Sequence, residues 1–235
     1  MPPIDNAIAW AFERYNNQRE FRASSVEIGN VLWATRATQS LVPGADILGS
    51  TGSAVAPYTP GDFLKLLGHL AGQGDEFLGD VHCHVRASSS WLGHYPSPTD
   101  IASESCLCDH WPLVPPVSLG SELLTHLPIA SQFQIVQTNL FGDLFVVEAT
   151  NGRVPFISLA QQMSGMTAIE SAFLNWHRQA NVRLGPCGGR VSHSIFVKQA
   201  NAELGLMNAA LGGRATIRFL TNDGFVSDSS NFLAT

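Results

Sequence analysis

The residues Phe77–Val85 read FLGDVHCHV, and their alternation of apolar and polar side chains predicts a β-strand. Successive side chains of a strand point to opposite faces, so His82 and His84 share one face and can reach a single ion. Cys83 then points the other way, into the core. Two histidines on the solvated face of a strand would give the same pattern. The stretch alone therefore does not establish a metal site.

A cap-like turn follows this strand at Ser97–Asp100 (SPTD). Serine is a preferred helix cap, proline suits the first helical position, and Asp100 lies three residues after the cap. We expect this turn to present Asp100 close to His82 and His84. Two neutral imidazoles and one carboxylate suit Zn²⁺, and three protein ligands leave a fourth position open for catalysis. Capping alone would also account for Ser97 and Asp100.

Glu27 lies in a second apolar stretch, Val26–Thr35 (VEIGNVLWAT), which is interrupted by Gly29 and predicts a buried strand. An ionisable group in such a strand is costly to bury without a partner, and a water activated by zinc is one such partner. A carboxylate beside that water can take its proton and pass it to a leaving amine. A residue at a strand edge that points to solvent would look the same.

The order of helical and strand patterns along the chain predicts an α/β fold without internal repeats. We expect a compact core over residues 1–155 and a mainly helical extension over residues 156–235, packed on that core without being an independent domain. The expected helices are 4–16, 63–70, 160–180 and 193–211, and the expected further strands are 132–138, 144–150 and 215–220.

Composition excludes several classes of function. The chain has 235 residues, 45% of them hydrophobic and 14% charged, with a net charge of -6, so it lacks the cationic field that binds nucleic acid. We expect no membrane span, because no run approaches about 20 apolar residues. Charges within the first 18 residues argue against a signal peptide. Four cysteines in a chain of this length do not suggest a disulfide framework, which is typical of smaller secreted domains. The expected location is cytoplasmic, or outside the cell after delivery by a specialised secretion system.

The motifs occur in an order that resembles the JAMM/MPN+ zinc metallopeptidases: a Glu-x-Gly strand, then His-x-His, then Ser-x-x-Asp. The resemblance spans roughly Ile4–Thr150 and implies a cytidine-deaminase-like core, in which a mixed sheet is flanked by helices. Within the family, residues 79–84 and 96–101 look most like the JAMM-like domains of bacterial polymorphic toxins and effectors.

The resemblance assigns a role to each site residue. It implies that His82, His84 and Asp100 are zinc ligands, that Glu27 is the general acid and base, and that the Ser97 hydroxyl helps to hold the oxyanion. The implied reaction is hydrolysis of a peptide or isopeptide bond in a protein substrate, such as a ubiquitin-like conjugate. A toxin would also have an immunity or secretion partner. The alternative is a non-catalytic MPN-like binding or scaffold module.

The chain departs from the family pattern in three places. Cys83 replaces the usual serine or threonine between the histidines, and Val85 replaces proline. Ser97 lies 13 residues after His84, which is a longer spacing than is usual in the family. We expect the intervening Arg86–Tyr95 to bulge out beside the site, where its Trp91, His94 and Tyr95 would shape substrate access.

Two rival sites use cysteine. Cys106, Cys108 and His110 form a metal-like cluster, but a second ligand pair at zinc-finger spacing is missing, so we expect buried or incidental thiols. A Cys-His hydrolase would need an exposed thiolate at Cys83 or Cys187, and the strand position of Cys83 argues against it. Three further histidines remain in reserve as a third ligand in place of Asp100: His94, His110 and His126.

Overall fold

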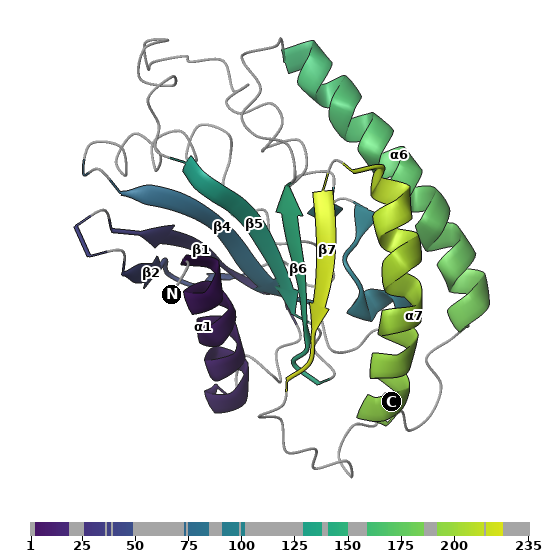
Figure 1. Ribbon diagram of the computed structural model, residues 1–235, viewed down its shortest axis with the longest axis horizontal. Coiled ribbons are helices and arrows are strands. Elements are labelled where there is room, and N and C mark those ends of the chain that lie inside the picture. The colour runs from purple at the N-terminus through teal and green to yellow at the C-terminus, as the bar shows by residue number, and fades with distance from the viewer. Residues whose placement is uncertain are drawn as a thin grey trace.

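The computed structural model describes residues 3–18, 26–35, 37–38, 40–48, 73, 75–84, 91–98, 100–101, 129–137, 141–149, 159–185, 192–213 and 215–222. Over these residues the chain forms a mixed β-sheet flanked by helices (Figure 1), which confirms the predicted α/β class. Among the described helices, none is both long enough and apolar enough to cross a membrane. The expected helix at 63–70 lies outside the described residues.

The described strands form a single seven-stranded sheet in the order β2-β1-β4-β5-β6-β7, and β3 pairs with β1 beside β2. The pair β4–β5 is parallel, whereas the other described pairs are antiparallel. The strands are β1 (Ile28–Ala34), β2 (Leu41–Pro43), β3 (Ile47–Leu48), β4 (Glu76–Cys83), β5 (Ile129–Gln137), β6 (Leu144–Ala149) and β7 (Ala215–Leu220). The helices are α1 (Pro3–Asn17), the short 3₁₀ helix η1 (Trp91–His94), α6 (Leu159–Leu184) and α7 (His193–Leu211).

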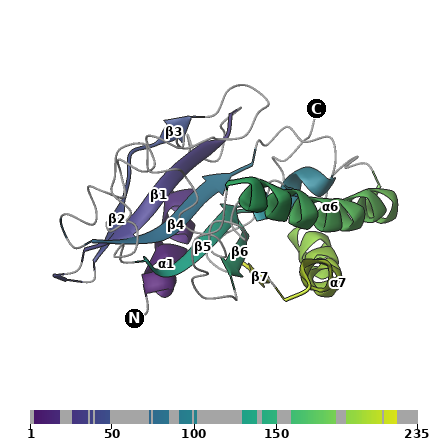
Figure 2. The ribbon, with the colours of Figure 1, turned by 90° about the horizontal axis from the view of Figure 1, so that it is seen from above.

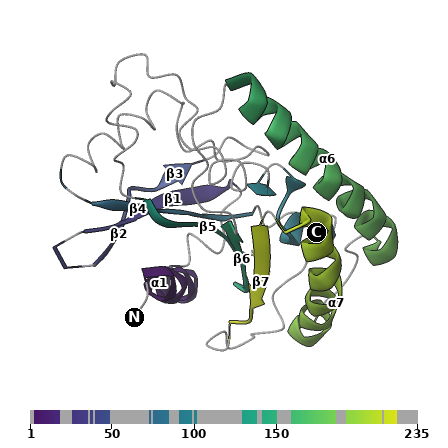
Figure 3. The same ribbon diagram turned by 45° about the horizontal axis from the view of Figure 1, so that its top comes forward.

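Helix α1 packs against one face of the sheet (Figure 3). Its apolar residues recur at helical spacing, and Ala7 and Ala11 are fully buried against Val81, Ile135 and Val146 of three strands. The predicted helix at 4–16 is therefore confirmed.

The other face of the sheet carries the larger core. Phe145 and Val147 alternate with the residues of β6 that face α1, so they point to the opposite side and pack with α6, α7 and η1. Figure 2 shows α6 and α7 together at the β7 end of the sheet. Hydrogen bonds to Glu203 of α7 link the two helices. Its carboxylate accepts from Trp176 Nε1 at 2.9 Å and from Arg183 at 2.7 and 3.0 Å, and both donors lie in α6. Since β7 pairs with β6, the chain beyond residue 156 contributes a strand as well as helices.

A β-bulge in β4 sets which residues face which side. The register between β1 and β4 shifts at Leu78, so Leu78 and Val81 both join the core under α1. Gly79, at φ 150°, occupies the bulge. Beyond it the regular alternation resumes, and His82 is left on the face opposite α1.

Candidate metal centre

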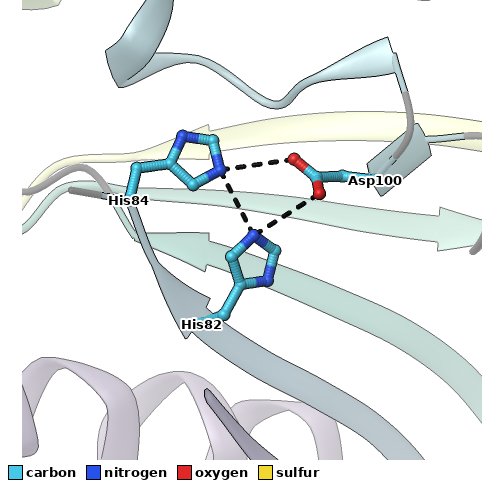
Figure 4. Close-up of side chains that lie close together, drawn as sticks. All are labelled: His82, His84 and Asp100. Atoms are coloured by element: carbon cyan, nitrogen blue, oxygen red, sulfur yellow. Dashed lines mark hydrogen bonds and ion pairs between the residues drawn. The ribbon is translucent and has the colours of Figure 1, made fainter. Parts of the chain in front are cut away.

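His82, in β4, and His84, one residue past the end of β4, project on the face away from α1 (Figure 4). Cys83 between them is fully buried with Tyr15 and Ile28, which confirms that it faces the core. Burial raises the pKa of the Cys83 thiol to about 11, so the thiol is protonated at neutral pH. A hydrolase that uses Cys83 as its nucleophile is therefore not supported.

Asp100 completes a triangle of potential ligand atoms. The Nε2 atoms of His82 and His84 lie 3.2 Å apart, His84 Nε2 lies 3.3 Å from Asp100 Oδ2, and His82 Nε2 lies 3.6 Å from Asp100 Oδ1. The two distances to Asp100 involve different carboxylate oxygens. Tetrahedral zinc, with bonds of about 2.0–2.2 Å, separates its ligand atoms by about 3.3–3.6 Å. The group could hold a metal ion, and both its atoms and its spacing are compatible with zinc.

A capping box holds Asp100 in place. The Ser97 N–H donates to Asp100 Oδ2 at 2.8 Å, and the Asp100 N–H donates back to Ser97 Oγ at 3.1 Å. The Ile101 N–H donates to the Ser97 carbonyl at 3.2 Å, and the Ile101 side chain is fully buried. The predicted helix start is confirmed, and its cap also orients the carboxylate toward the imidazoles.

A backbone carbonyl fixes the ring of His84. His84 Nδ1 lies 3.1 Å from the carbonyl oxygen of Gly93, which can only accept, so in the neutral ring the proton sits on Nδ1. The lone pair of Nε2 then faces His82 and Asp100, as metal binding requires. This partner was not predicted, because a carbonyl carries no side-chain signal in the sequence.

The turn that supplies this carbonyl corrects one prediction. Trp91, His94 and Tyr95 do not bulge out beside the site; they are 6%, 1% and 0% exposed and belong to the interior. All three rings pack against Phe196: Trp91 is stacked on it, His94 meets it edge-on and Tyr95 is tilted. Burial, aided by the neighbouring charge of His84, lowers the pKa of His94 to about 4. His94 also lies outside the triangle of potential ligands.

The electrostatics of the triangle favour a cation. Burial alone would lower the pKa of His82, but the charge and hydrogen bond of Asp100, together with the charges of Asp80 and Glu27, raise it to about 9. Burial alone would likewise raise the pKa of Asp100, but His82 and His84 hold it well below its usual range. The site thus keeps an ionised carboxylate and gathers positive charge beside it.

Glu27 lies on the same side of the sheet as the histidines. It directly precedes β1, one residue outside the strand in which we had expected it. Gly29 pairs with His82 and Ile28 with Cys83. Continued by one residue beyond the paired strands, this register brings Glu27 opposite His84, on the face that both histidines share. Gly29 adds no side chain to this face, and Glu27 is among the charges that raise the pKa of His82.

The rival ligands fall outside the described residues: Cys106, Cys108, His110, His126 and Cys187. Within the described part of the chain, His82, His84 and Asp100 form the group of three side chains suited to a metal ion. No protein-family model matches the chain, and no curated protein matches it significantly.

Proposed function

We propose that the chain is a zinc-dependent hydrolase of amide bonds, of the JAMM/MPN+ metallopeptidase type. The observation that carries this proposal is the convergence of His82, His84 and Asp100, each of which offers one potential ligand atom within 4.8 Å of the other two. The ligands come from a strand and a helix start in the order of the family motif. The position of Glu27 on the same face supports it as the general base.

Each protein group then has a distinct task. A bound zinc ion supplies Lewis acidity, which polarises the scissile carbonyl and lowers the pKa of water to about 7. Glu27 takes the proton from the attacking water and delivers it to the leaving amine. The Ser97 hydroxyl accepts from the Asp100 amide and retains one proton that it can donate to the developing oxyanion.

The proposed substrate is a protein or peptide, including isopeptide conjugates of ubiquitin-like proteins. This class comes from the family resemblance, as does the proposal of a bacterial toxin or effector with an immunity or secretion partner. The net charge of -6 supports a protein substrate over nucleic acid.

A hydrolysis panel tests the proposal. Zinc-loaded protein is incubated with linear peptides and with isopeptide-linked ubiquitin-like conjugates, and mass spectrometry locates any cleaved bond. We expect cleavage of at least one amide class, loss of cleavage with a chelator, and recovery on adding zinc. The His84→Ala variant controls for contaminating proteases. Full zinc loading without cleavage of any substrate would favour the non-catalytic binding module.

A further inference from the structure

Phe196, in the first turn of α7, packs against the turn Trp91–Tyr95, which lies beside the metal centre. Its ring is fully buried and stacks on Trp91, with centroids 6.0 Å apart and planes inclined by 12°. The same ring meets His94 edge-on at 6.2 Å and Tyr95 at 5.8 Å. One side chain therefore contacts residues on both sides of Gly93.

The position of Phe196 is itself well defined. Helix α7 begins at the cap Ser192, whose Oγ accepts from the Ile195 N–H at 3.3 Å. The rings of Phe141 and Phe219 lie 5.7 and 6.0 Å from that of Phe196, so the β5–β6 turn and β7 also hold it. The Phe196 ring is therefore held by contacts with the sheet as well as by its own helix.

Gly93 does little to fix the orientation of its own peptide plane. Glycine has no side chain to pack and the widest choice of backbone angles, so the direction of the Gly93 carbonyl depends on the residues around it. The Tyr95 N–H closes the turn by donating to the Leu92 carbonyl at 3.1 Å. The rings of Trp91, His94 and Tyr95, packed on Phe196, fix where the turn lies.

We propose that Phe196 is a positioning residue for the metal centre: by seating the Trp91–Tyr95 turn, it aims the Gly93 carbonyl at His84 Nδ1 and so fixes the orientation and tautomer of this ligand. The chain of contacts runs from the helix to the turn, then through the hydrogen bond of 3.1 Å to the ring. Its consequence for metal affinity rests on the proposed function, whereas its consequence for the His84 tautomer does not.

If Phe196 only stabilised the core, its loss would affect the metal centre no more than the loss of any other buried ring. Phe173 provides that comparison. Phe173 on α6 is equally buried in the same core, and among the described residues its ring contact is with Trp176, at 4.7 Å. Trp176 in turn meets Tyr95 at 6.1 Å, so Phe173 reaches the turn only through a second ring. Phe196→Leu and Phe173→Leu remove similar apolar volume from the same core. Only Phe196→Leu removes a ring that packs directly on the Trp91–Tyr95 turn. Phe196→Met, which keeps more of the volume, replaces Phe196→Leu if the latter does not fold.

The experiment uses two readouts on the full chain. Imidazole ¹⁵N resonances of His84 in metal-free protein, assigned with His84→Gln, report whether Nδ1 carries the proton. Zinc titration against a competing chelator reports affinity. We expect wild type and Phe173→Leu to keep the proton on Nδ1, and Phe196→Leu to give a mixture of tautomers. Zinc affinity should fall about 10–100-fold in Phe196→Leu alone, as is usual when the hydrogen-bond partner of a metal ligand is lost.

The two proposals fail in different ways. If wild type binds no zinc but the tautomers differ as expected, the metal centre fails and the positioning role stands. If zinc binds but both leucine variants keep the wild-type tautomer, or both lose it equally, the positioning role is overturned.

Discussion

The Nε2 atom of His82 lies 3.2 Å from the Nε2 atom of His84. Two imidazole nitrogens approach this closely when they share a proton or a cation, because two facing lone pairs repel. The proton of neutral His84 is committed to the Gly93 carbonyl, so its Nε2 can only accept. Asp100 supplies the negative charge that a cation between these atoms requires.

The charge of Asp100 should govern metal affinity. Asp100→Asn removes the charge but keeps a carbonyl oxygen that can accept from the Ser97 N–H, so the fold should persist. We expect zinc affinity to fall by more than the roughly 10–100-fold typical of losing a partner of a metal ligand. Competition with a chromophoric chelator measures this loss. Asp46→Asn, which alters an exposed carboxylate paired with Arg14, should leave affinity unchanged.

Zinc binding should strengthen as pH rises. The pKa of His82 in the metal-free protein is raised to about 9, so below that pH each bound ion must displace a proton. Affinity should rise by about tenfold per pH unit up to pH 9 and then level off. Calorimetry in buffers of different ionisation enthalpy counts the protons released. Affinity that is independent of pH between 6.5 and 8.5 would contradict the raised pKa of His82 in the metal-free site.

The free energy of unfolding of the metal-free protein should fall as pH rises. The pKa of His82 is higher in the folded chain, about 9, than its ordinary value of 6.5. Its stabilising contribution is therefore fully present below about pH 6.5 and is lost as pH rises through 9. Urea denaturation of metal-free protein from pH 6 to 9.5 should show this decline, and His82→Gln should remove it. A decline of the same size in His82→Gln would assign it to other groups.

Glu27 should be needed for turnover but not for metal binding. Glu27→Gln keeps the size of the side chain and removes its basicity, so zinc content should match wild type while kcat falls about 10²–10⁴-fold. Glu13→Gln, on the exposed side of α1, is the matched control and should change neither. Wild-type turnover in Glu27→Gln would exclude Glu27 as the base.

Much of this arrangement could be predicted from local patterns. Alternation placed His82 and His84 on one face and Cys83 in the core, and cap chemistry identified the turn from Ser97 to Asp100. Both signals are local, because strand and cap residues act through their immediate neighbours. Helix α7 and strand β7 also match their predicted bounds, since each has a consistent apolar pattern.

The features that the sequence did not predict depend on contacts between segments that are far apart in the chain. The expectation that Trp91, His94 and Tyr95 bulge out beside the site was wrong, because these side chains pack on Phe196, a residue far along the chain. The Gly93 carbonyl could not be foreseen, since every residue has one. Only the tertiary structure shows which carbonyl meets an imidazole.

The turn between β5 and β6 should tolerate no side chain at Gly142. This residue has φ 75°, and a Cβ there would collide with the ring of Tyr15. Gly142→Ala should lower the free energy of unfolding by about 2–4 kcal/mol, from backbone strain and overpacking together. Gly205→Ala is the control: the residue lies within α7 with nothing near its Cβ position, and the change should raise stability by about 0.5–1 kcal/mol. Chemical denaturation compares the two, and equal effects would contradict the close contact with Tyr15.

Anomalous X-ray scattering at the zinc edge, from crystals grown with zinc, tests the metal centre most directly. We expect one strong peak within about 2.0–2.2 Å of His82 Nε2, His84 Nε2 and an Asp100 oxygen. A peak at the cysteines 106 and 108 instead, or none between the two imidazoles, would contradict it.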